Sequence, residues 1–339
     1  MDIHLVYEFL DVELTLSKKL LKKMLESHET PFVSELIQFF LGSKNKMLRP
    51  ALLFLSFRAS GGSDKDLSIE HDLIKAAVAM ELMHRASLLH DDVLDQSEYR
   101  HERLSFHKKW SPEIAITFGN FIYAQAFRMI ATVRDIEILK AFTKATDYLC
   151  EGELRQVCQR KNLDFSREEY ETIIQRKTAS LFSTSCFIGA KAAGSTSDLS
   201  KKFYDFGKSL GIGFQMIDDM RDFVSPVDDS SSSKGKKGEL GKNPGQDLFS
   251  GDVTLPLIHL LNVTENKKEI LELFKKNQDG ASFLALREMF LKSEALEMTR
   301  NDINIYVKRA KSFLDNMPSS ESVLVLEKFV NFLIKRLDR

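Results

Sequence analysis

Two groups of three aspartates with the same DDxxD spacing lie in distant parts of the chain. They are Asp91, Asp92 and Asp95, and Asp218, Asp219 and Asp222. On a helix, residues i and i+4 share a face, whereas residue i+1 lies about 100° further round the turn. Each group would therefore form a compact acidic patch, and each sits in an apolar run where an unpaired carboxylate is costly.

Carboxylates in apolar surroundings need a cation to offset their charge. Oxygen ligands without a nearby cysteine suit Mg²⁺, which proteins often bind through a few carboxylates together with substrate phosphate oxygens. The sequence therefore predicts a split Mg²⁺ site with all six aspartates as candidate ligands, and a metal-bridged diphosphate as its leading ligand. A chance acidic turn at a helix end would explain a single DDxxD motif about as well as a metal site does. Two such motifs in apolar helices favour the metal site.

Polar residues accompany both aspartate groups at helical spacing. His84 and Ser87 precede the first group on the same stripe, and Gln215 lies four residues before Asp219 of the second. A satisfied core histidine is the ordinary interpretation of His84, but the adjacent Arg85 and the two acidic groups favour a polar cavity. We therefore expect His84 and Gln215 to face a bound ligand.

Basic and small residues complete the candidate site. The basic residues are Lys44, Lys46, Arg49, Arg100, Arg103 and Lys177, each of which alone is typical of a solvated surface charge. Gly211 and Gly213 stand just before the second aspartate group and predict close packing of this helix on a neighbour.

The elements that would position these residues are helices. Apolar residues recur at spacings of three and four almost throughout, only 7 prolines interrupt them, and alternating strand patterns are hard to find. Helix starts are predicted at Ser111-Pro112 and at the capping box formed by Ser166 and Glu169. We therefore expect an all-α fold, a single large helical bundle that forms one domain over residues 1–339.

One segment departs from the helical pattern. Residues 225–246 are rich in Ser, Lys and Gly, and such a composition is too polar to fold alone. We predict a mobile loop here, either a tolerated surface insertion or a lid that brings lysines to a phosphate.

Composition narrows the partners and the compartment. The 48 basic and 49 acidic residues give a formal net charge of −1, which argues against nucleic acid or an anionic membrane as a partner. Three cysteines without a CxxC pair argue against a disulfide framework or structural zinc and favour a cytoplasmic protein. We expect no secretory signal, because the first apolar stretch carries acids, and no integral membrane segment, because no run of about 18 apolar residues occurs.

Six segments occur in an order that is typical of one protein family. They are KMLRP (46–50), ELMHRASLLHDDVLD (81–95), EGELRQ (151–156), RKTASLF (176–182), GIGFQMIDDMRDF (211–223) and GDVTLPLI (251–258). In these motifs the chain resembles the trans-polyprenyl diphosphate synthases, the head-to-tail isoprenoid chain elongases, from about Lys44 to Leu260. The resemblance implies the isoprenoid synthase fold, a helical bundle around a central cavity, and a homodimer.

The resemblance also implies roles for individual residues. It gives direct Mg²⁺ contacts to Asp91, Asp95 and Asp218. The remaining aspartates, Asp92, Asp219 and Asp222, complete or support the metal shells, so that three Mg²⁺ ions surround the allylic diphosphate. The residues matching the allylic diphosphate site are Arg100, Lys177, Thr178, Gln215 and Lys242. Those matching the isopentenyl diphosphate site are Lys46, Arg49 and His84. The expected catalytic set is Asp91, Asp92, Asp95, Lys177 and Asp218.

The chain departs from the family pattern at four positions. His101 stands where a second arginine follows Arg100, and its titratable imidazole would weaken isopentenyl diphosphate binding above neutral pH. Met47 replaces the first arginine of the KRLRP motif, and Asn243 replaces a proline. Asp252 replaces the lysine of GKxTLP, which removes one expected phosphate contact.

The implied reaction is a sequential condensation of isopentenyl diphosphate with an allylic diphosphate. Mg²⁺ and basic residues stabilise the departing diphosphate, the isopentenyl double bond attacks the allylic carbon, and the released diphosphate is the expected base. Ala86 and Ser87, five and four residues before Asp91, are small and leave a product tunnel open toward Met83 and Met80. We therefore expect a medium or long product, with a short-chain farnesyl or geranylgeranyl diphosphate synthase as the alternative.

Three other classes share some of these features. A terpene cyclase that begins with ionisation needs no second diphosphate site, and Lys46, Arg49 and His84 argue against it. A non-catalytic subunit of a heteromeric synthase would not need to keep all six aspartates. A two-metal nuclease is disfavoured because the net charge is close to zero and the sequence has no basic stripe.

Overall fold

The computed structural model describes residues 4–28, 30–43, 45–63, 65, 67–100, 103–224, 245–276 and 280–335. The predicted mobile loop at 225–246 lies outside these residues except for its last two positions. Four residues singled out in the sequence also lie outside the described residues: Lys44, His101, Lys242 and Asn243.

The described chain is helical almost throughout, which confirms the all-α prediction. In order along the chain, the helices are α1 (His4–Phe9), α2 (Asp11–Leu25), α3 (Pro31–Leu41), α4 (Leu48–Ala59), α5 (Asp72–Leu94), α6 (Phe106–Lys109), α7 (Pro112–Ile130), α8 (Ile136–Gln159), α9 (Arg167–Ile174), the π-helical turn η1 (Gln175–Ala179), α10 (Ser180–Ala192), α11 (Ser197–Val224), α12 (Gln246–Ser250), α13 (Leu255–Val263), α14 (Lys267–Lys275), α15 (Gly280–Lys292), α16 (Ala295–Asp315) and α17 (Glu321–Ile334). Two short antiparallel strands, β1 (Tyr99–Arg100) and β2 (Arg103–Leu104), follow the first aspartate group.

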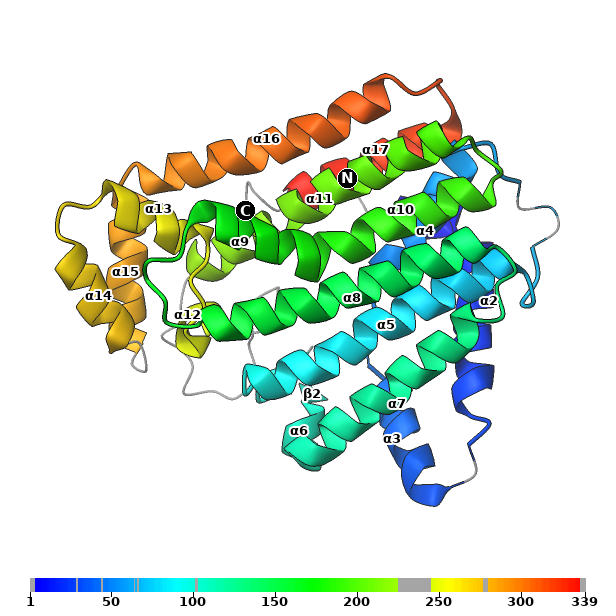
Figure 1. Ribbon diagram of the computed structural model, residues 1–339, viewed down its shortest axis with the longest axis horizontal. Coiled ribbons are helices and arrows are strands. Elements are labelled where there is room, and N and C mark those ends of the chain that lie inside the picture. The colour runs from blue at the N-terminus through cyan, green and yellow to red at the C-terminus, as the bar shows by residue number, and fades with distance from the viewer. Residues whose placement is uncertain are drawn as a thin grey trace.

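The long helices lie beside one another and run roughly the same way across the molecule (Figure 1). Helix α5 packs against α7, α10 packs against both α4 and α11, and α11 packs against α16. The shorter helices α13, α14 and α15 gather at one end. The two helices that carry the aspartate groups, α5 and α11, are therefore core elements of the bundle.

The apolar core consists of two clusters that share helix α11. The larger cluster takes Phe203, Phe206 and Leu210 from the first half of α11, together with side chains of α2, α4, α5, α7, α8 and α10. The smaller cluster takes Met216 and Phe223 from its second half, together with side chains of α9 and α13 to α16. Because one continuous helix belongs to both clusters, we propose that the chain forms a single domain, as the sequence predicts.

The predicted helix starts are present. Ser111 accepts a hydrogen bond from the backbone N–H of Ile114 at 3.3 Å, with Pro112 in the first turn of α7. Ser166 and Glu169 form the reciprocal capping box at the start of α9. These local signals fix where α7 and α9 begin, and α9 leads directly into the turn that carries Lys177 and Thr178.

Close packing against that turn, η1, depends on glycine. A Cβ built on Gly211 would come 2.6 Å from the Cα of Ala179, and one on Gly152 would come 2.6 Å from the backbone N of Lys177. The predicted close approach of α11 is therefore confirmed at Gly211. It is wrong at Gly213, where an added Cβ would lie 3.5 Å from the nearest side-chain atom, an ordinary contact.

Candidate active site

Both aspartate groups line one cavity of about 480 Å³. The helices α5 and α11 bring all six aspartates to this cavity from opposite sides. The other predicted residues among its lining are Lys46, Arg49, His84, Ser87, Arg100, Arg103, Lys177, Thr178 and Gln215. Sequence segments that are far apart in the chain thus form one chamber between the helices, lined by charged and apolar side chains together.

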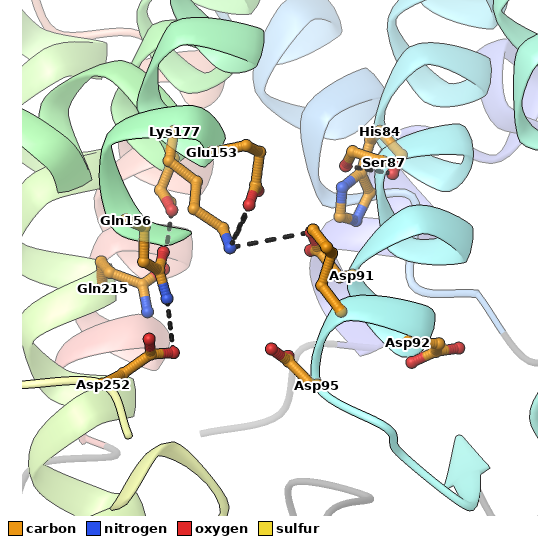
Figure 2. Close-up of polar contacts among 12 residues, drawn as sticks. His84, Ser87, Asp91, Asp92, Asp95, Glu153, Gln156, Lys177, Gln215 and Asp252 are labelled. Carbon is orange, nitrogen blue, oxygen red and sulfur yellow. Dashed lines mark hydrogen bonds and ion pairs between the residues drawn. The ribbon is translucent and has the colours of Figure 1, made fainter. Parts of the chain in front are cut away.

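The side chains of the first aspartate group point in two different directions (Figure 2). Figure 2 shows Asp91 and Asp95 on the side that faces Lys177 and Asp252, whereas Asp92 is turned away from them. Asp92 instead forms an ion pair with Arg100, whose Nε and Nη2 both lie 2.7 Å from its Oδ1. The helical spacing predicted this division, because Asp92 lies about 100° round the turn from Asp91.

Lys177 points from η1 toward the first aspartate group. Its Nζ lies 2.8 Å from Glu153 Oε1 and 3.7 Å from Asp91 Oδ1 (Figure 2). Burial alone would lower the pKa of Lys177, but the charges of Asp91 and Glu153 raise it overall. Burial, with the charge of Asp91, raises the pKa of Glu153 to about 8. Lys177 is therefore a half-buried cation inside an acidic cavity.

The second aspartate group is fixed by a hydrogen-bond relay. Thr178 Oγ1 donates to Gln215 Oε1 at 2.7 Å, and Gln215 Nε2 donates to Asp219 Oδ1 at 2.7 Å. The Tyr170 hydroxyl donates to the other oxygen of Asp219 at 2.6 Å. Burial, with the nearby charge of Asp247, raises the pKa of Asp219 to about 8. This relay links the two predicted ligand-binding residues Thr178 and Gln215 to a predicted metal ligand.

The basic end of the cavity is built around a buried carboxylate. Glu81 has no exposed surface, accepts a hydrogen bond from Asn45 and interacts with the charges of Arg85 and Arg49. Burial lowers the pKa of Arg49 to about 10, so this guanidinium is still charged at neutral pH. Met47 has a φ of 46° at the start of α4. This left-handed conformation is costly for a residue with a side chain and is typical of functional loops.

A short segment connects the two aspartate groups across the cavity. Gln246 Nε2 donates to the backbone O of Asp95 at 3.2 Å, and the backbone N–H of Asp247 donates to Asp222 Oδ2 at 3.2 Å. Asp247 itself lines the cavity. The helix α12 therefore holds the ends of α5 and α11 in a fixed relation.

Asp252 lines the cavity at the position where the family pattern has a lysine. An amide group and a guanidinium group hydrogen-bond to its carboxylate. Gln156 Nε2 donates to its Oδ2 at 2.7 Å, and Arg160 Nε donates to its Oδ1 at 3.0 Å. Burial raises the pKa of Asp252, and the charge of Arg160 opposes that shift. The departure from the family pattern is thus accompanied by an arginine that the sequence analysis did not single out.

Several residues of the site were missed in the sequence. Glu153 and Gln156 lie inside the EGELRQ segment, at i and i+3 on one helical face, so their spacing offered a signal. Three others, Tyr170, Arg160 and Asp247, reach the site through tertiary packing. Residue spacing in the sequence does not predict such contacts.

The predicted product tunnel is closed beyond Ser87. Ser87 lines the cavity, but Ala86, Met83 and Met80 have no exposed surface. Met83 Sδ lies 3.7 Å from Thr146 Oγ1, so side chains of α5 and α8 meet one turn beyond Ser87. Methionine has an unbranched, adaptable side chain, so rotation of Met83 can open the tunnel.

The donor set fits Mg²⁺ bound together with a substrate. Its oxygens come from carboxylates on two helices, which are the hard ligands that Mg²⁺ prefers. Among the described residues, no three acidic, histidine or cysteine side chains converge closely enough to hold an ion by themselves. Phosphate oxygens and waters commonly complete the shell of Mg²⁺, so an ion shared between these carboxylates and a diphosphate suits the arrangement.

Two further observations concern the molecule as a whole. Within the described ranges, no helix combines the length and the apolar character that crossing a membrane would require. All three cysteines are free, with Cys186 buried and Cys150 and Cys158 exposed.

Known proteins match this chain over most of its length. The family model described as polyprenyl synthetase matches residues 30–288. The heptaprenyl diphosphate synthase component 2 of Geobacillus stearothermophilus is 30% identical over 99% of both chains. The octaprenyl diphosphate synthase of Haemophilus influenzae is 30% identical over 86% of this chain and 85% of its own.

A solved structure agrees with these sequence matches. The polyprenyl synthase from Caulobacter crescentus, crystallised with calcium and isoprenyl diphosphate, superposes with a TM-score of 0.88 at 28% identity, and the match covers 98% of this chain and 97% of that one. The motifs, the helical fold and the matches agree, and the chain belongs to the polyprenyl synthetase family of prenyltransferases.

Proposed function

We propose that the protein condenses isopentenyl diphosphate with an allylic diphosphate in successive Mg²⁺-dependent steps and releases a medium or long all-trans polyprenyl diphosphate. The observation that carries this proposal is that both aspartate groups line the same cavity as Lys46, Arg49 and His84. Two sets of phosphate-binding groups in one cavity fit a reaction with two diphosphate substrates. A cyclase that begins with ionisation needs only one.

The six aspartates, together with Asp247, would hold Mg²⁺ on the allylic diphosphate. When bound, Mg²⁺ would neutralise charge on the leaving diphosphate and so favour ionisation of the allylic carbon. Lys177 adds a half-buried cation beside Asp91, where its N–H groups can donate to the leaving oxygens as charge develops. Arg100 supports this end of the cavity by orienting Asp92.

The basic residues at the other end orient the second substrate. Lys46, Arg49 and His84 would bind isopentenyl diphosphate so that its double bond faces the allylic carbon. Apolar lining residues such as Leu88, Leu149 and Phe214 exclude water from the carbocation. The released diphosphate is the proposed acceptor of the final proton.

We propose a product of medium or long chain length on the basis of small residues next to the first aspartate group. Ser87 lines the cavity and Ala86 follows behind it in the bundle, so no bulky side chain plugs the entrance to the tunnel. Relatives named heptaprenyl and octaprenyl diphosphate synthase support this length class.

We further propose a homodimer that works in a reducing compartment such as the cytoplasm. The three free cysteines suit such a compartment. Two relatives are named as component 2 of a heptaprenyl diphosphate synthase, so the test below also asks whether this chain needs a different partner. The cavity carries every predicted catalytic residue, Asp91, Asp92, Asp95, Lys177 and Asp218, so we assign catalysis to this chain.

The test is to incubate the purified protein alone with Mg²⁺, isopentenyl diphosphate and farnesyl or geranylgeranyl diphosphate, and to determine product length. Elongated all-trans products would support the proposal. Cyclised products, or hydrolysis without elongation, would contradict it. Elongation that begins only after a second polypeptide is added would contradict the homodimer and leave the chemistry intact.

A further inference from the structure

Asp252 places a buried carboxylate in the cavity wall where a diphosphate is proposed to bind. Its side chain is 6% exposed, and it lines the same cavity as Asp95. Two neighbouring carboxylates repel each other and would also repel an anionic substrate unless a cation lies between them. The sequence analysis predicted only a lost phosphate contact at this position.

Arg160 supplies that cation and contacts both carboxylates. Its Nε donates to Asp252 Oδ1 at 3.0 Å, while its Nη2 donates to Asp95 Oδ1 at 2.6 Å. Its Nη1 donates to the backbone O of Leu94 at 2.9 Å. Gln156 occupies the second oxygen of Asp252 at 2.7 Å. The planar guanidinium thus bridges a predicted metal ligand and the residue that replaces the lysine.

The backbone holds this bridge in place. Arg160 ends α8, and the next residue, Lys161, adopts a φ of 63° and donates its backbone N–H to Gly251 O at 2.8 Å. Gly251 has a φ of 83° and stands directly before Asp252. A left-handed residue on each side of one hydrogen bond therefore sets Arg160 opposite Asp252. Glycine adopts this conformation without steric cost, whereas for Lys161 it is costly, and such a conformation persists where the surrounding structure requires it.

An ordinary surface ion pair would not have these properties. The Arg160 side chain is 19% exposed, and it makes three charge-assisted or backbone hydrogen bonds at once. Asp252 and His84 lie on opposite sides of the group of residues in Figure 2, so the bridge belongs to the end of the cavity away from the isopentenyl diphosphate residues.

We propose that Arg160, anchored by Asp252, is a positioning residue for the allylic diphosphate. Asp95 Oδ1 is held by Arg160 Nη2 in this structure, and in the proposed function the same carboxylate serves Mg²⁺. With Asp95 on Mg²⁺, Nη2 would be released while Nε would stay on Asp252, and the freed N–H would be able to donate to a phosphate oxygen. This inference rests on the proposed function and identifies which cation replaces the lysine of the family pattern.

The test measures binding of inorganic pyrophosphate with Mg²⁺ by calorimetry, using full-length protein and its variants. Losing a charge-assisted hydrogen bond should weaken binding by about tenfold or more in Arg160→Ala. Asp252→Asn should also weaken binding, because the guanidinium loses its anchor. The decisive variant is Arg160→Ala combined with Asp252→Lys, which restores one cation to this wall and should bind pyrophosphate within about threefold of wild type.

A matched control and a kinetic readout separate positioning from a structural role. Arg155→Ala removes an arginine from the same helix that is 51% exposed and pairs with Glu151, and it should leave pyrophosphate binding unchanged. In steady-state assays Arg160→Ala should raise KM for the allylic diphosphate and leave KM for isopentenyl diphosphate near wild type. If Arg160→Ala does not fold, Arg160→Lys provides the same comparison, because lysine cannot bridge the three acceptors.

Two results would overturn the inference. One is unchanged pyrophosphate affinity in a folded Arg160→Ala protein. The other is equal loss in Arg160→Ala and in the double variant, which would mean that the pair only supports the fold. Failure of the proposed function would look different. Wild-type protein would then elongate neither farnesyl nor geranylgeranyl diphosphate, whatever its affinity for pyrophosphate.

Discussion

Lys177 and Glu153 form a half-buried ion pair between η1 and α8, with Lys177 Nζ 2.8 Å from Glu153 Oε1. Both residues also interact with Asp91, so two carboxylates share one ammonium group. The pair places a cation beside the first aspartate group before any metal is present, and it makes the protonation of Glu153 depend on pH in the physiological range.

This pair predicts how stability depends on pH in metal-free protein. Burial raises the pKa of Glu153 from an ordinary 4.5 to about 8, so between these values the folded protein keeps a proton that the unfolded chain releases. Its contribution to stability is therefore present below pH 4.5 and is lost as the pH rises through about 8. Glu153→Gln should flatten this decline in the free energy of unfolding, measured by urea titration in EDTA.

The slope should not vanish, because burial also raises the pKa of Asp219 to about 8 and acts in the same direction. Glu137→Gln, at an exposed position on the same helix, is the control and should keep the wild-type slope. An identical slope in Glu153→Gln would show that Glu153 is not the group that titrates.

The two glycines near the start of the second motif should respond differently to alanine. In Gly211→Ala the new Cβ would lie 2.6 Å from Ala179 Cα, so α11 and η1 must separate. We expect a loss of about 1–3 kcal/mol, as is typical of overpacking. Gly213→Ala meets only an ordinary contact at 3.5 Å and should be neutral or up to about 1 kcal/mol stabilising, because alanine favours helix. Thermal unfolding of both variants checks this, and equal effects would contradict it.

Much of the site could be predicted from the sequence because its chemistry depends on local helical spacing. The spacing of Asp91, Asp92 and Asp95 fixes which carboxylates share a face, and the structure shows that arrangement. Ser166 and Glu169 likewise specify the start of α9 through contacts within one turn. In both cases the interacting groups lie within four residues of each other.

What could not be predicted depends on contacts between distant segments. The Tyr170–Asp219 hydrogen bond and the Arg160 bridge join residues from different parts of the chain, so the helical periodicity of the sequence does not predict them. The π-helical turn at Gln175–Ala179 is also set by packing, since Gly152 and Gly211 let α8 and α11 approach it from two sides. That turn alters the direction of Lys177 and Thr178 in a way that a regular helix would not.

Removal of one predicted metal ligand should abolish most activity without unfolding the protein. Asp91→Asn keeps the side-chain shape but removes the charge that faces Lys177, and we expect kcat to fall by at least about 10²-fold. EDTA should have the same effect on wild-type protein, and added Mg²⁺ should reverse it. Asp147→Asn, an exposed position on α8, should retain activity. Near-normal turnover of Asp91→Asn in Mg²⁺ would contradict the assigned role.

The contact between Met83 and Thr146 should limit product length. Met83 has no exposed surface, and its sulfur lies 3.7 Å from Thr146 Oγ1 where α5 and α8 meet beyond Ser87. Met83→Ala would open space there at a cost of about 2–5 kcal/mol in stability, as large-to-small core substitutions do. We expect longer products by chain-length analysis. An unchanged product distribution in folded protein would mean that the chain grows in another direction.

A bulky side chain directly behind Ser87 should have the opposite effect. Ala86 is fully buried five residues before Asp91, so position 86 lies roughly 7.5 Å along the helix axis from the acidic group. The ring in Ala86→Phe would meet the growing chain early and should shorten the product, at an overpacking cost of about 1–3 kcal/mol. Ile136→Phe, at a position that is 56% exposed, adds the same ring outside the bundle and should leave product length unchanged. If both variants fold and give the wild-type product ladder, the growing chain does not pass Ala86.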